Sequence, residues 1–538
     1  MSATRTLLVS NLRVPLDTIE GDVCFLAQKT LRQAGILPSG ATARIYRRSV
    51  DARKRDRITL VYSVAVTGAF SSRDLERAKK LSGISLMKES MPLPVHGDTP
   101  LFHPPVVVGS GPAGLFCALI LAEEGYRPIL IERGGSVSER REVIRRFSRE
   151  RILDTETNVQ FGAGGAGTFS DGKLVTRVGD PMTAYVLDTF CTFGAPDRVR
   201  TDARPHIGTD VLTGIVDRMI ARIESLGGEV RFHTRLDGLV LQGDHITGIR
   251  TTKGEIPCEA LVLAIGHSAR DTYRMLFDTP VLVEPKPFSV GVRVEHLQAD
   301  IDQALYGDFA GHPALGAAEY HLSHDTARRG VYSFCMCPGG FVMPAASQEN
   351  TVVVNGMSNA ARDGINANSA IAVSVFREDY GNTPQRAIAF QERIEKDAFV
   401  AGGNTYAVPL TTMGDFLCEK RGTKPSRIQP TYMDGQAYAC ASPDDYLPDF
   451  VTGALRGGLS AFEKQIRGFT APDAILSGAE TRTSAPVRIL REAESRTAIG
   501  VSNLYPCGEG AGYAGGITSA ALDGIHTALA LMRTYRPL

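Results

Sequence analysis

The spacing of apolar and polar positions divides the chain near residue 100. Before this point, three stretches alternate as strands do and two have helical spacing: 5–14, 41–50 and 58–67, then 20–34 and 73–81. The resulting βαββα order predicts a small ferredoxin-like α+β domain over residues 1–97. Residues 88–104 are rich in proline and aperiodic, as linkers are.

From Val106 onward, the pattern changes to strand, helix and strand. VVV (106–108) reads as a short buried strand, Leu115 to Glu124 as a helix, and PILIER (128–133) as the next strand. Residues 229–266 alternate like successive strands, and residues 504–533 return to strand, glycine-rich loop and helix. This order predicts an α/β fold.

The pattern G-x-G-x-x-G occurs three times, so context has to separate the copies. They are Gly109/Gly111/Gly114, Gly162/Gly164/Gly167 and Gly510/Gly512/Gly515. Only the first follows an apolar strand, opens a helix and has an acidic residue at the end of the next strand, Glu132. The first copy therefore predicts a dinucleotide site.

Each residue type in this turn has a physical role toward a dinucleotide. Gly109 permits the tight turn, Gly111 leaves room for a pyrophosphate, and Gly114 lets helix and strand pack closely. The N–H groups at the start of the helix favour the phosphates. Glu132 is expected to accept hydrogen bonds from ribose hydroxyls. One βαβ unit does not decide between NAD and FAD.

Longer segments carry a resemblance to known flavoproteins. VVVGSGPAGLFCALILAEEGYRPILIERG (106–134) resembles the FAD site of the glutathione-reductase-like, two-dinucleotide-binding flavoproteins. NVQFGAGGAGTFSDGKLVTR (158–177), CMCPGG (335–340), ETRTSAPVRILR (480–491) and YPCGEGAGYAGGITSAALDGI (505–525) resemble a narrower group of bacterial uncharacterised FAD-dependent dehydrogenases (NAD(P)/FAD-dependent oxidoreductases). This resemblance implies FAD as cofactor and leaves the substrate open.

The resemblance also implies an architecture. We expect a Rossmann-like FAD-binding domain in two parts, with an inserted α+β cap or substrate domain between them and the ferredoxin-like domain in front. The expected bounds are 98–280 and 485–538 for the two FAD-binding parts and 281–484 for the inserted domain.

The C-terminal segment supports FAD independently. A strand ending at Pro506 leads into Gly508-Glu509-Gly510 and then into Gly516-Ile517-Thr518 and a helix. The N–H groups of that helix would stabilise the negative charge of a reduced flavin. The two glycine loops predict cofactor contacts from Gly109, Ser110, Gly111, Pro112, Ala113, Gly114, Glu132, Arg133, Gly508, Gly516, Ile517 and Thr518. The resemblance to flavoproteins implies further contacts from Gly167, Thr168, Lys173, Leu236, Ala264, Gly266 and Glu509.

Candidates for the reaction itself are weaker, and the catalytic residues stay unknown. Lys173, Cys335, Cys337 and His267 are the named candidates. The two cysteines form C-x-C, and the absence of C-x-x-C near the first helix argues against a disulfide reductase, so ordinary thiols are favoured. The Cys and His spacing predicts no metal site. Without a second strand–GxGxxG–helix unit in 281–484, NAD(P)H is expected only as a transient electron donor.

Charge and cysteine content restrict partners and location. Lys+Arg and Asp+Glu are both 59, yet residues 1–97 carry 16 basic and eight acidic residues, a net charge of +8. Nine irregularly spaced cysteines and no apolar leader predict a cytoplasmic protein without a transmembrane segment.

We expect an oxidoreductase that transfers hydride through flavin N5 to or from a small-molecule or lipid substrate, with no DNA partner. Two alternatives stay open: a flavoprotein whose basic domain docks an anionic macromolecule or lipid, and a non-catalytic FAD-binding regulator.

Overall fold

The computed structural model describes residues 3–38, 40–87, 94–176, 178–326 and 328–538. These residues form two units, and the chain passes between them several times. The first unit comprises residues 1–92, 179–206 and 299–318, and the second comprises 93–178, 207–298 and 319–538. Part of the expected linker, residues 88–93, lies outside the described residues.

The first unit contains a four-stranded antiparallel sheet in the order β2-β3-β1-β4. Its elements are β1 Ala3–Val14, α1 Glu20–Gln33, β2 Thr42–Asp51, β3 Thr59–Phe70, α2 Ser72–Lys79 and β4 Ile84–Leu86. The buried face of α1 is formed by Val23, Ala27 and Leu31, whose spacing of four places them on one side of the helix. Later segments add α5 Thr183–Thr192, α6 Arg198–Thr201 and most of α9 Gln298–Tyr306.

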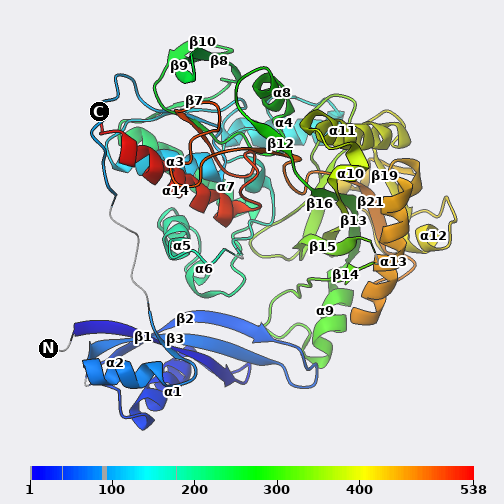
Figure 1. Ribbon diagram of the computed structural model, residues 1–538. Helices are drawn as coiled ribbons and strands as arrows, with labels where there is room; N and C mark the ends of the chain where they lie inside the picture. The colour runs from blue at the N-terminus through cyan, green and yellow to red at the C-terminus, as the bar shows by residue number, and fades with distance from the viewer. Residues whose placement is uncertain (1–2, 39, 88–93, 177, 327) are drawn as a thin grey trace. The chain divides into compact units, whose positions relative to one another are not determined.

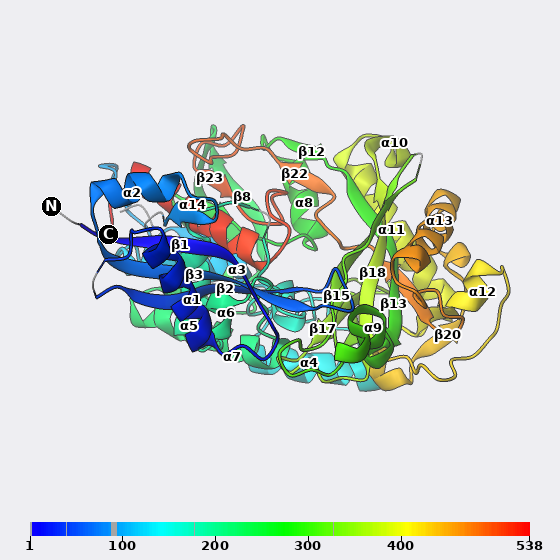
Figure 2. The same cartoon turned by 90° about the horizontal axis from the view of Figure 1, so that it is seen from below.

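A five-stranded parallel sheet in the order β23-β11-β5-β6-β7 lies in the second unit. Its strands are β5 Val106–Val108, β6 Ile129–Ile131, β7 Glu229–Arg231, β11 Leu261–Leu263 and β23 Leu504–Pro506. Helices α3 Pro112–Glu123 and α14 Ile517–Thr534 lie side by side (Figures 1 and 2). Their contact requires Gly524, because a Cβ there would lie 2.1 Å from the Ala113 carbonyl oxygen.

The second unit also contains a seven-stranded sheet with the strand order β14-β15-β18-β13-β21-β19-β20. Its strands are β13 Phe288–Leu297, β14 Ser323–Asp325, β15 Gly330–Cys337, β18 Asn366–Val375, β19 Val408–Thr412, β20 Tyr438–Cys440 and β21 Ile475–Glu480. Helix α11 Pro384–Ala401 contacts β19 and β21, and α13 Asp449–Gln465 contacts β13, β15 and β18 (Figure 1). The central strands β13 and β18 are buried almost throughout, so both sides of the sheet are covered there.

Smaller elements complete this unit. They are α4 Val137–Glu150, α7 Thr209–Ser225, β8 Leu236–Gln242, β9 His245–Thr251, β10 Gly254–Pro257, α8 Arg270–Phe277, β12 Val283–Pro285, β16 Gly340–Pro344, β17 Val354–Ser358, α10 Arg377–Tyr380, α12 Met413–Leu417 and β22 Val487–Ile489. The structure thus has a mixed α/β architecture, as the sequence predicts.

The described helices include none that is both long enough and apolar enough to span a bilayer. Although the stretch from residue 104 to 122 lacks charged residues, it forms a strand, a glycine turn and the buried helix α3. Helix α3 is apolar on every side because each of its residues from Ala113 to Ala122 is buried in the protein.

Candidate functional site

A cavity of about 350 Å³ lies in the second unit, within the size range of small-molecule sites. Its wall combines the turn after β5, the loop after α4, the ends of β6 and β11, the strand β15 and the start of α14. These segments are far apart in the sequence. The cavity therefore joins the glycine turn after β5, which is predicted to bind the pyrophosphate, to residues of the region between 281 and 484.

The three glycines of the first motif have three different surroundings. Gly109 has a φ of 97°, a left-handed conformation that favours glycine. A Cβ on Gly114 would lie 1.8 Å from the Gly109 carbonyl oxygen, so helix and strand can pack only around a glycine. A Cβ on Gly111 would have only Gly165 Cα within 4.0 Å, and it would extend into space beside the cavity wall.

Glu132 ties two glycine loops together. One carboxylate oxygen accepts hydrogen bonds from Ser110 N (3.0 Å) and Ser110 Oγ (2.7 Å), and the other from Gly134 N and Gly162 N (both 3.0 Å). Four protein donors thus occupy the carboxylate, which has about four acceptor sites. A hydrogen bond from a ribose hydroxyl to Glu132 stays a prediction.

Arg140, which no sequence motif singles out, shapes the second glycine loop. This fully buried side chain on α4 donates to the carbonyl oxygens of residues 158, 159, 162, 163 and 165. Gly162, Gly164 and Gly165 all have positive φ, so the carbonyl groups can converge on one guanidinium. An arginine inside an amphipathic helix gives no sequence signal for this role, since surface arginines have the same spacing.

A second ionic anchor holds the loop before α14. Asp523 accepts a hydrogen bond from Gly508 N at 2.7 Å and forms ion pairs with Arg491 and Arg496. These contacts of Asp523 fix the loop that contains Glu509, a residue of the cavity wall. Burial raises the pKa of Glu509 to about 7, although the Lys286 ammonium opposes the shift. Glu509 thus exchanges a proton near neutral pH.

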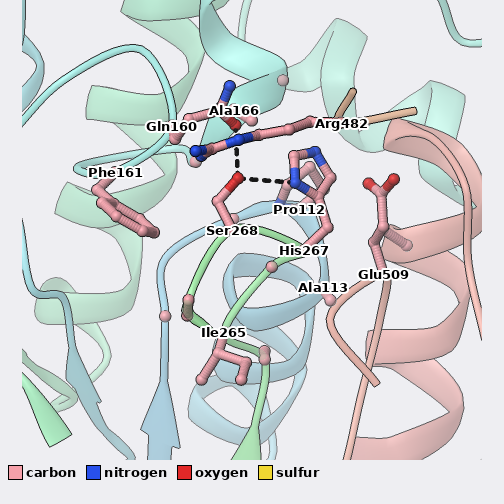
Figure 3. Close-up of a pocket in the computed structure, with 18 of the residues that line it drawn as sticks. Pro112, Ala113, Gln160, Phe161, Ala166, Ile265, His267, Ser268, Arg482 and Glu509 are labelled. Carbon is pink, nitrogen blue, oxygen red and sulfur yellow. Dashed lines mark hydrogen bonds between the residues drawn. The ribbon is translucent and has the colours of Figure 1, made fainter. Parts of the chain in front are cut away.

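His267 and Glu509 both line the cavity and are both labelled in Figure 3. The Nδ1 atom of His267 is 2.8 Å from Ser268 Oγ, which in turn donates to Gln160 Oε1 at 3.1 Å. Burial lowers the pKa of His267 to about 3, and the Arg482 and Arg270 guanidiniums lower it further. His267 is therefore a neutral imidazole at physiological pH.

Arg482 also borders the cavity and belongs to a buried ionic triad. Arg270 binds Glu395 with two hydrogen bonds of 2.7 Å, and Arg482 binds the same carboxylate at 3.1 and 3.2 Å. Burial alone would raise the pKa of Glu395, but the two guanidiniums hold it well below its usual range. The triad carries one net positive charge, and Arg482 serves here in a salt bridge.

At another part of the wall, Lys173 and Cys335 line the cavity together with Phe334, Asn355 and Glu480. Lys173 donates to the Met336 carbonyl oxygen and lies 3.9 Å from Glu319. Behind them, the fully buried Arg293 binds Glu480 with two hydrogen bonds of 2.9 Å.

Most of the predicted residues meet at this cavity. Those that line it are Gly109, Gly111, Pro112, Ala113, Glu132, Arg133, Gly167, Lys173, Leu236, Ala264, Gly266, His267, Cys335, Glu509, Gly516 and Ile517. Those outside the lining are Ser110, Gly114, Thr168, Cys337, Gly508 and Thr518. Several of the latter have protein partners, such as the Leu174 carbonyl oxygen for Thr518 Oγ1 and the Thr209 hydroxyl for the Thr168 carbonyl oxygen. Roles of the individual residues toward the cofactor stay predictions.

The shape of the cavity and its backbone donors determine which cofactor it can hold. A Cβ built on Gly266, Gly515 or Gly516 would meet no atom within 4 Å, so backbone borders open space at these positions. Helices α3 and α14 both begin at the cavity, with Pro112 and Ile517, and their first N–H groups favour negatively charged groups. The residues present therefore fit a flavin dinucleotide.

Comparison with known proteins supports this fit. Residues 105–140 match the FAD binding domain, residues 287–483 match the FAD-dependent protein, C-terminal domain-like family, and residues 7–67 match a domain of unknown function. FAD is thus the cofactor, and the matches support an FAD-dependent oxidoreductase.

Solved protein structures show only distant likeness to this chain. L-amino acid deaminase from Proteus vulgaris is 15% identical, with 84% of this chain and 98% of that chain covered and a TM-score of 0.33. L-proline dehydrogenase from P. horikoshii is 13% identical, with 80% and 93% covered and a TM-score of 0.32. Likeness at this level carries no argument about substrate.

One curated relative is much more similar. A protein of Clostridium beijerinckii, described as an uncharacterized protein, is 46% identical over 490 residues, which cover 90% of this chain and 91% of the relative. The chain therefore belongs to the same protein family as this Clostridium beijerinckii protein.

Proposed function

We propose that this protein is an FAD-dependent dehydrogenase or reductase that transfers hydride between flavin N5 and a small-molecule substrate. The main support for this proposal is the cavity itself. It joins the glycine turn at Gly111 to residues of the region that matches the FAD-dependent C-terminal family. A substrate seated beside Lys173, Phe334 and Asn355 would share one cavity with the cofactor.

The bound flavin would supply two-electron chemistry, and the protein supplies orientation and charge. The backbone at Gly111 and Gly516 allows close approach of the cofactor, while the N-termini of α3 and α14 favour its negative groups. Glu509, with its pKa of about 7, holds or releases a proton inside the cavity. His267, kept neutral, can accept or donate a hydrogen bond there without adding charge.

Anaerobic reduction tests the proposal. We expect NADH or NADPH to bleach the flavin absorbance of the purified protein at about 450 nm, and an added acceptor to restore it. Stopped-flow spectroscopy with both nucleotides, followed by an acceptor screen, measures this. A flavin that no nucleotide and no chemically plausible donor substrate reduces would instead favour the non-catalytic FAD-binding regulator.

An exposed basic loop supports a second candidate function, in which the first unit docks an anionic macromolecule or lipid. Lys54, Arg55 and Arg57 are exposed between β2 and β3. We expect Lys54→Glu/Arg55→Glu/Arg57→Glu to abolish salt-sensitive binding of the full chain to RNA or anionic vesicles, whereas Arg73→Glu/Lys80→Glu retains it. Absence of wild-type binding to both probes at low salt would remove this candidate.

The proposal extends to the architecture. A Rossmann-like FAD-binding domain with an inserted α+β cap domain is supported by the parallel sheet around β5 and by the separate seven-stranded sheet. The order β2-β3-β1-β4 supports a ferredoxin-like N-terminal domain. Membership of the glutathione-reductase-like superfamily and a cytoplasmic location belong to the same proposal.

A further inference from the structure

A β-bulge places one of the two C-x-C cysteines on the cavity wall. In the pairing of β15 with β18, Phe334 lies opposite Ala370 and Cys337 opposite Asn368, so β15 has one extra residue in this interval. Cys335 lies within the bulge and has a φ of 47°. Neighbouring residues of a regular strand point to opposite faces, yet Phe334 and Cys335 both line the cavity.

Cys337 lies behind Cys335 and is fully buried. Its Sγ donates a hydrogen bond to the Cys335 carbonyl oxygen at 3.3 Å. Space for Cys337 depends on Gly356, because a Cβ there would lie 2.8 Å from Cys337 Sγ. Both cysteines are free thiols in the structure. Cys335 thus lines the cavity, and the buried Cys337 lies two residues further along the same strand, with its thiol on the Cys335 carbonyl oxygen.

The bulge is fixed by two cations. Arg293 donates to the Cys335 carbonyl oxygen at 3.2 Å, and Lys173 donates to the next carbonyl oxygen, that of Met336. The hydrogen bond from Cys337 lowers the pKa of Cys335 to about 7; burial opposes this shift, and Arg293 and Lys173 support it. The acidic groups around this position are Asp171, Glu480, Glu319 and Glu509.

We propose that Cys335 and Cys337 form a redox-active dithiol–disulfide pair that exchanges two electrons with the flavin. This inference rests on the proposed function, because the flavin is the electron donor. In the oxidised pair, the two Sγ atoms are bonded. Reduction breaks that bond, adds two electrons and two protons, and leaves two thiols, while the reduced flavin returns to its oxidised form. Cys335, on the cavity wall, would react first, and the Cys337 thiol would be the second sulfur of the disulfide.

The first test needs neither turnover nor bound FAD. Both cysteines fall in one tryptic peptide, residues 330–362, which holds no other cysteine. After mild oxidation of the native protein with diamide, we expect this peptide to lose its two thiol hydrogens and to resist alkylation until a reductant is added. Cys335→Ser and Cys337→Ser should each abolish that change, whereas Cys440→Ser, at an exposed cysteine, should not.

Alkylation with iodoacetamide against pH gives a second readout. At pH 7, Cys335 should hold roughly fifteenfold more thiolate than an ordinary thiol. Its alkylation should therefore have a midpoint near pH 7. Cys337→Ala removes the neighbouring thiol and should raise this midpoint, while Cys337→Ser, which keeps an O–H donor, should change it less.

The number of electrons taken up per chain distinguishes failure of the cysteine pair from failure of the proposed function. Anaerobic titration of the diamide-treated, FAD-loaded protein should consume about four electrons per chain in the wild type and in Cys418→Ser/Cys440→Ser, but about two in Cys335→Ser/Cys337→Ser. Equal uptake in all three, with no modified 330–362 peptide, would overturn the dithiol. Failure of nucleotides to reduce the flavin, with the peptide disulfide still formed, would instead overturn the proposed electron supply.

Discussion

Replacement of Gly111 by valine is expected to leave the protein folded and to remove its FAD. Gly111 has φ −67° and ψ 179°, an extended conformation that valine adopts without strain. The new side chain would contact little protein, since only Gly165 Cα lies as near as 4.0 Å to the Cβ position. It would occupy the space from which the pyrophosphate approaches the turn.

We expect the affinity for FAD to fall by about a hundredfold or more, equivalent to roughly 3 kcal/mol. Flavin retained after gel filtration and titration of the apoprotein with FAD measure this loss. Gly457→Val is a matched control, because Gly457 is an exposed glycine on α13 with no atom within 4 Å of its Cβ position. A Gly111→Val protein that keeps its yellow cofactor would show that the dinucleotide does not pass this turn.

Removal of the Glu395 carboxylate should strongly destabilise the second unit. In Glu395→Ala, the guanidiniums of Arg270 and Arg482 stay buried without their shared counter-ion. The free energy of unfolding should fall by about 3–5 kcal/mol, the usual cost of breaking a buried ion pair from one side. Urea-induced unfolding followed by circular dichroism measures the change.

A nearby exposed carboxylate provides the control. Asp397 lies on the same helix, α11, and Asp397→Ala should change the free energy of unfolding by less than about 0.5 kcal/mol. If Glu395→Ala is no less stable than Asp397→Ala, the triad does not stabilise the fold around the cavity.

The stabilisation from Glu395 should depend on pH in one direction. Its pKa is lower in the folded protein than in the unfolded chain, where a glutamate titrates at about 4.3. The stabilisation is therefore complete above that value and is lost as the pH falls toward the folded pKa. The difference in stability between wild type and Glu395→Ala should be constant from about pH 6 to 8 and shrink below about pH 4.

The sequence by itself determined the local elements and the cofactor class. Short-range spacing predicted β5, the glycine turn and the helix after it, although α3 begins at Pro112 rather than at Leu115. FAD as cofactor was confirmed by the match over residues 105–140. These features are predictable because a strand, a tight turn and a helix N-terminus depend on neighbouring residues only.

Only the tertiary structure decided which distant side chains share the site. The ring of carbonyl oxygens around Arg140, the triad of Arg270, Glu395 and Arg482, and the place of Cys335 on the wall all require segments that are far apart in the chain. Cys335 faces the cavity because one extra residue in β15 shifts the alternation of the strand. Strand alternation read from the sequence cannot locate such a bulge, since it arises from pairing with β18 and from the cations that hold the bulged carbonyl groups.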